Sequence, residues 1–140
     1  MKKVFALAMA ALMVAALFAG CAPAGSNGGN ASNTEFVIGM SGPLTGGAAV
    51  YGVAVKNAAQ MAVDEINAAG GLNGFKFKLV ATDDQHDPTK VATNYANLMN
   101  QGMQVSLGTV TTGPALEFKT LAKEDNVFFI TPSASADAVP

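Results

Sequence analysis

The chain has 140 residues, with eight lysines, no arginine, ten acidic residues and one cysteine. Its formal net charge is −2 at pH 7, and six lysines against ten acids leave −4 over residues 22–140. A chain with no arginine and no basic stripe is poorly suited to bind a phosphate backbone, so we expect no nucleic-acid partner. The single cysteine excludes an intramolecular disulfide and a cysteine-cluster metal site.

Residues 1–21 have the three parts of an export signal. Two lysines follow the initial methionine, Val4 to Phe18 is an unbroken apolar run, and small residues precede Cys21. The run is shorter than the ~20 residues that a membrane-spanning helix needs, so an uncleaved anchor is the weaker alternative. Residues 22–35 are rich in glycine, serine and asparagine, a composition that predicts a flexible tether.

The segment from residue 36 to residue 71 predicts a strand, a Gly/Pro-rich loop and a long helix. Phe36 to Met40 is a short apolar run with β-forming residues, which is typical of a buried strand. Residues 50–69 place apolar side chains at steps of three and four, as expected for one face of a helix. That face comprises Val55, Ala59, Ala62, Ile66 and Ala69. Gly70 and Gly71 then favour a helix stop.

The rest of the chain continues the alternation of strands and helices. Predicted strands lie at 76–82, 103–108 and 127–131, and predicted helices at 89–100 and 114–125. Lysines that alternate with apolar residues place the strand 76–82 at a sheet edge. The alternation predicts an α/β fold with a parallel, doubly wound (Rossmann-like) sheet and right-handed crossovers.

Candidate ligand-binding residues lie in loops that follow strands. With a strand order of 2-1-3-4, the direction of winding reverses between the first and third strands, and ligands bind at such a switch point. The loops 41–52 and 109–114 then flank a crevice, 131–140 lies beside it, and the helix start after 109–114 favours an anion such as a carboxylate. The candidates are Tyr51, Thr111, Thr112, Ser133 and Ser135. From the residues alone, ordinary polar loops with capping threonines and a packing tyrosine explain the pattern equally well.

The segment 83–88 contains three aspartates and the only histidine of the chain. A metal site or a catalytic dyad is one interpretation, but a helix start is the better one, with Asp87 as N-cap and Pro88 as first helical residue. No nucleophile accompanies His86, so no triad can form, and the glycine-rich loop has no nucleotide-binding spacing. We therefore expect no enzymatic activity, metal or cofactor.

Five segments resemble, in the same order, those of the leucine/isoleucine/valine-binding family of type I periplasmic binding proteins. They are SGPLTG, DEINAAGG, DDQHDP, GTVTTGPA and ITPSAS. The resemblance covers nearly all of residues 36–140. It implies a partial amino-terminal lobe of a two-lobed ligand-binding domain whose second lobe is missing.

The resemblance also implies roles for the candidate residues. Thr112 would give its hydroxyl and amide to the ligand α-carboxylate, and Ser133 its backbone carbonyl to the α-ammonium. Ser135 would contribute a hydroxyl and an amide, and Tyr51 would pack against the ligand. Some members of the family carry a disulfide at the positions of His86 and Thr111, which this chain cannot form.

The function implied is that of an extracytoplasmic receptor of an ABC importer, which binds branched-chain or other small amino acids and docks on ABC permease subunits. The residues before and at Cys21, FAGC, resemble a lipobox with phenylalanine in place of the usual leucine. They imply a lipid at Cys21 that anchors the protein to the cell membrane. One alternative is a ligand-sensing receptor domain of the same fold, for amino acids or amides. A Rossmann-like enzyme is disfavoured by the leader, the missing phosphate motif and the single histidine.

Overall fold

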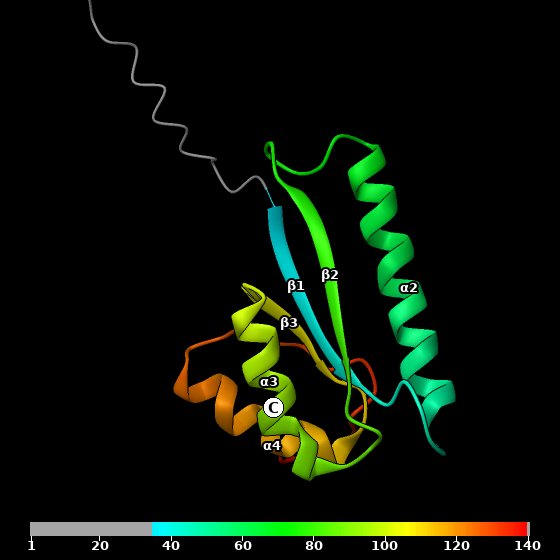
Figure 1. Ribbon diagram of the computed structural model, residues 1–140, viewed down its shortest axis with the longest axis vertical. Coiled ribbons are helices and arrows are strands. Elements are labelled where there is room, and N and C mark those ends of the chain that lie inside the picture. The colour runs from blue at the N-terminus through cyan, green and yellow to red at the C-terminus, as the bar shows by residue number, and fades with distance from the viewer. Residues whose placement is uncertain (1–34, 140) are drawn as a thin grey trace, which may run out of the picture. The chain divides into compact units, whose positions relative to one another are not determined.

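The computed structural model describes residues 35–139, which form a parallel sheet with helices on both faces (Figure 1). The elements are β1 (Glu35–Gly42), α2 (Ala49–Ala68), β2 (Lys76–Asp83), the 3₁₀ helix η1 (Pro88–Lys90), α3 (Val91–Asn100), β3 (Val105–Thr109) and α4 (Thr112–Glu124). The predicted signal, Cys21 and residues 22–34 of the tether lie outside the described residues. None of the helices in this range combines the length and apolar character that crossing a bilayer requires.

The strand order is β2-β1-β3, with β1 parallel to both neighbours. The chain passes from β1 to β2 through α2, and then from β2 across to β3 through α3. These two connections run in opposite directions, so α2 covers one face of the sheet while α3 and α4 cover the other (Figure 1). The predicted doubly wound α/β class and the edge position of β2 are confirmed.

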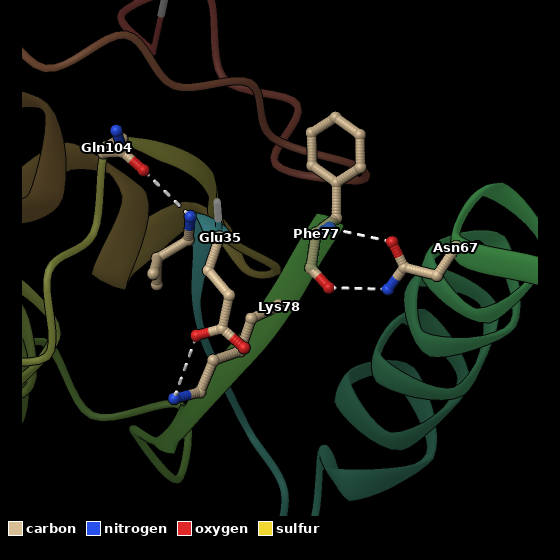
Figure 2. Close-up of polar contacts among 6 residues, drawn as sticks. Glu35, Asn67, Phe77, Lys78 and Gln104 are labelled. Carbon is tan, nitrogen blue, oxygen red and sulfur yellow. Dashed lines mark hydrogen bonds and ion pairs between the residues drawn. The ribbon is translucent and has the colours of Figure 1, made fainter. Parts of the chain in front are cut away.

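One side chain of α2 closes part of the open edge of β2. The amide of Asn67 accepts a hydrogen bond from the N–H of Phe77 (2.8 Å) and donates one to its carbonyl (2.7 Å) (Figure 2). Asn67 therefore satisfies backbone groups that an edge strand otherwise leaves unpaired.

The predicted inner face of α2 is wrong in part, because Ile66 is 42% exposed while Gly52 and Val63 are buried. The face of α2 toward the sheet passes through Val63 and Asn67, one residue beyond the predicted Ala62 and Ile66.

The main core lies between the sheet and the pair α3 and α4. Phe118 is completely buried there and meets the ring of Tyr95 at 5.1 Å and that of Phe129 at 5.4 Å between centroids. Leu116, although apolar, is 37% exposed. The helix starts at Thr112, and its buried face runs through residues 114, 115, 118 and 122 at helical spacing.

The predicted fourth strand, 127–131, is reduced to a single parallel bridge between Phe129 and Ser106. The N–H of Ser106 donates to Phe128 O and its carbonyl accepts from Ile130 N, both at 3.0 Å. The ladder stops there because Gly108 turns away with φ +52° and donates its N–H to Ser106 Oγ. The predicted position beside β3 is thus correct, but the predicted length is wrong.

Candidate ligand-binding site

A shallow cleft of about 300 Å³ opens at the carboxyl ends of the three strands. Its walls are formed by Tyr51, His86, Val110, Thr111, Thr112 and Ser133. Four of the five predicted site residues therefore lie together, as the switch-point argument requires. The fifth, Ser135, does not line the cleft, but its backbone N–H donates to the Thr112 hydroxyl oxygen at 3.2 Å.

Three hydrogen bonds fix the loop 131–135 against the segment 109–112. They run from Thr131 Oγ1 to Thr109 O (2.7 Å), from Ser133 Oγ to Val110 O (2.5 Å) and from Ser135 N to Thr112 Oγ1 (3.2 Å). Because the Thr112 oxygen accepts a bond, its hydroxyl proton is left to donate to a ligand. The Ser133 hydroxyl donates its only proton to Val110 O, so its oxygen can only accept a hydrogen bond from a ligand, as can the backbone carbonyl of this residue.

Thr111 occupies the N-cap position of α4 but makes no capping bond with its side chain. Its hydroxyl is buried and has no hydrogen-bond partner among the described residues. Buried polar groups are normally paired, so an unpaired one calls for an explanation. The interpretation of these threonines as ordinary capping residues therefore fails for Thr111.

The amino terminus of α4 lies at the cleft through Thr112. The helix begins two residues earlier than expected, so Pro114 is its third residue and not its first. The first N–H groups of a helix have no acceptor within it, and the helix dipole is positive at this end. The cleft thus combines a hydroxyl donor with a helix terminus that favours a carboxylate.

Asp83 fixes the loop that carries the chain from β1 to α2. Its carboxylate accepts hydrogen bonds from Leu44 N (2.8 Å), Thr45 N (3.3 Å), Thr45 Oγ1 (2.5 Å) and Gln85 N (3.0 Å). Partial burial disfavours the charge, but these bonds, of which the one from the Thr45 hydroxyl contributes most, outweigh it and lower the pKa of Asp83 to about 2. The loop is therefore held by an ionised side chain.

Asp83→Asn should destabilise the protein at neutral pH and have little effect in acid. The folded pKa of about 2 lies below the ordinary aspartate pKa of 3.8, so the stabilisation is complete above pH ~4 and is lost as the pH falls through about 2. The shift corresponds to ~2.4 kcal/mol, of which solvent screening leaves about 1 kcal/mol. Urea unfolding at pH 7 and pH 2.5 measures the difference, with exposed Asp64→Asn as control. A pH-independent difference would contradict this account.

The cleft residue that the sequence analysis missed is His86. Asp87 accepts from Thr89 N at 2.9 Å and Pro88 opens η1, so the predicted helix start is confirmed. Helix capping, however, explains only Asp87 and Pro88. The strand order offers a signal for the position of His86. Its loop follows β2, β2 lies directly beside β1, and the loop after β1 leads into the cleft.

Two other features of the described residues bear on the choice of site. Residues 35–139 contain no group of three or more His, Cys, Asp or Glu side chains that could hold a metal ion. A larger hollow of about 620 Å³ lies beside α4 and the segment after it, with Val127, Phe129 and Ile130 in its wall. It follows from the short fourth strand, and it lacks the convergent strand ends and the helix terminus that the cleft has.

The fold is that of a lobe of the parallel α/β class with a cleft at the carboxyl ends of its strands. Residues 35–140 match the family described as periplasmic binding protein, and the chain belongs to that family. It is 38% identical over 105 residues to the Leu/Ile/Val-binding protein BraC3 of Rhizobium johnstonii, covering 75% of this chain and 29% of the relative. It is 32% identical over 123 residues to the leucine-, isoleucine-, valine-, threonine- and alanine-binding protein of Pseudomonas aeruginosa, covering 88% and 33%.

Among solved structures, the chain resembles the branched-chain amino acid transporter substrate-binding protein LivJ of Streptococcus pneumoniae in complex with isoleucine. The TM-score is 0.70 and the identity 34%, over 75% of this chain and 30% of that one. The chain thus spans about a third or less of the length of these relatives. The described residues correspond to part of the amino-terminal lobe of a two-lobed type I periplasmic binding protein.

Proposed function

We propose that this chain belongs to an extracytoplasmic receptor of an ABC importer, which binds branched-chain or other small amino acids. The observation that carries the proposal is the convergence of Tyr51, Thr112 and Ser133 on one cleft at the end of the sheet. The printed names of the relatives, which specify amino-acid binding and transport, support the choice of ligand class.

In the proposed complex, the Thr112 hydroxyl and the start of α4 bind the α-carboxylate of the amino acid. The Ser133 carbonyl accepts a hydrogen bond from the α-ammonium group, and the Tyr51 ring packs on the aliphatic part. No covalent step is involved. A second lobe closes over the ligand, and the closed form docks on ABC permease subunits.

The cleft of this chain should bind amino acids weakly by itself. Tight pockets enclose about 70–90% of a small ligand, whereas the Tyr51 side chain at this cleft is 61% exposed. We expect isoleucine to shift the NMR amide signals of Thr112 and its neighbours with a dissociation constant weaker than micromolar. 3-Methylpentanoate, which is isoleucine without the α-ammonium, and 2-methylbutylamine, which is isoleucine without the α-carboxylate, serve as matched controls. Micromolar or tighter binding by this chain alone would contradict the expectation, whereas failure of the full-length gene product to bind any amino acid would contradict the proposed function.

We also propose that Cys21 carries the lipid anchor and that residues 1–20 are removed. The support is the sequence alone, in which FAGC ends an apolar run and precedes a polar tether. Intact-mass spectrometry of detergent-extracted protein should show acyl chains on an amino-terminal Cys21, and Cys21→Ser should release the protein from membranes. A retained leader or a free thiol at Cys21 would rule out the anchor.

A further inference from the structure

His86 lies in the wall of the cleft but has no part in the recognition of the α-carboxylate and α-ammonium groups proposed above. Its backbone has φ +64°, and that of Gln85 before it has φ +54°. Residues other than glycine adopt this left-handed conformation uncommonly, although asparagine, aspartate and histidine do so more often than the rest. Since glycine would form the same turn without strain, the turn itself does not require a histidine here.

The turn that carries His86 is held in place by a buried carboxylate. Asp84 is completely buried, and it accepts hydrogen bonds from His86 N (2.9 Å) and from the Ser41 hydroxyl (3.1 Å). The Asp84 carbonyl also accepts from Asp87 N at 2.8 Å. His86 is therefore presented to the cleft by a fixed turn that is tied to both β1 and β2.

Two polar groups of this wall have hydrogen-bonding capacity that the described residues leave unused. The only hydrogen bond of His86 within residues 35–139 is made by its backbone N–H, and the Thr111 hydroxyl is buried without a partner. His86 is exposed and can bond to water, but an aliphatic ligand group that covered this wall would exclude that water and leave both groups unpaired, which is unfavourable. A site that hydrogen-bonds a substrate group discriminates strongly against an analogue that lacks it.

We propose that His86, together with Thr111, selects ligands whose side chain carries a hydrogen-bonding group. Polar small amino acids then bind more tightly than aliphatic amino acids of the same shape. This inference rests on the proposed function and narrows its ligand class, since the α-carboxylate and α-ammonium contacts are common to both kinds of amino acid.

Two nearly isosteric pairs test the selectivity: threonine against valine, and asparagine against leucine. Affinities are measured by calorimetry on the full-length gene product that contains this sequence. We expect the polar member of at least one pair to bind roughly tenfold more tightly, the effect of one hydrogen bond. His86→Gly removes the imidazole and suits φ +64°, so it should retain the fold and reduce the ratio to about one. His86→Asn tolerates the same backbone and should keep part of the preference.

Gln85→Gly is the matched control, because it relieves the same kind of backbone strain in the same turn without changing a cleft residue. It should leave both ratios unchanged. The inference is overturned if the unaltered protein prefers the aliphatic member of both pairs, or if His86→Gly leaves the ratios as they were. Failure of every amino acid to bind would overturn the proposed function itself and this inference with it.

Discussion

Gly52→Ala should lower the free energy of unfolding by up to about 2 kcal/mol and weaken ligand binding as well. Gly52 is buried in the first turn of α2, and a Cβ atom there would lie 2.1 Å from the carbonyl oxygen of Pro43. The obstacle is backbone, so it cannot move aside as a flexible side chain can. Overpacking typically costs 1–3 kcal/mol, which exceeds the ~1 kcal/mol that alanine gains over glycine in a helix.

The effect on binding follows from the position of Gly52 in the chain. Gly52 adjoins the cleft residue Tyr51, and Pro43 precedes Leu44, whose N–H is bound by Asp83. A Cβ atom that pushes Gly52 and Pro43 apart therefore displaces one wall of the cleft. Gly47→Ala is the matched control, because a Cβ there meets nothing within 4 Å. Thermal or urea unfolding of the two variants gives the comparison. Equal stabilities would show that α2 can shift without cost, contrary to our expectation.

Thr112→Val should weaken amino-acid binding by roughly 10- to 150-fold. The substitution retains the shape of the side chain but removes the donor to a charged carboxylate, a loss of ~1.5–3 kcal/mol. It also removes the acceptor of the Ser135 N–H, so the loop 131–135 loses one of its three connections to the segment 109–112. The measurement is calorimetric titration of the full-length gene product with the amino acid that it binds best.

Thr112→Ser provides the control for this prediction, because it retains the hydroxyl and loses only a methyl group. It should bind within a few-fold of the unaltered protein, and circular dichroism should show all three proteins folded. If Thr112→Val binds as tightly as Thr112→Ser, the α-carboxylate lies elsewhere in the cleft or outside it.

The sequence by itself determined the features that depend on local chemistry. The alternation of strand and helix patterns predicted the parallel α/β fold, and the lysines of residues 76 and 78 predicted an edge strand. The sequence Asp87-Pro88 predicted the start of η1, where the Asp87 carboxylate indeed accepts the N–H of Thr89. Such signals are readable because each is made by residues a few positions apart. The switch-point rule then placed four of the candidate residues in the cleft.

Tertiary structure alone decided the features that depend on residues far apart in the chain. The side chain of Asn67 turns inward because an edge strand offers it Phe77, and the segment after α4 lies beside β3 through the bridge between Phe129 and Ser106. His86 reaches the cleft because the buried carboxylate of Asp84 joins its turn to Ser41, which lies 43 positions from Asp84 in the sequence. A local pattern cannot predict such contacts, since they form only when strands distant in sequence pair side by side.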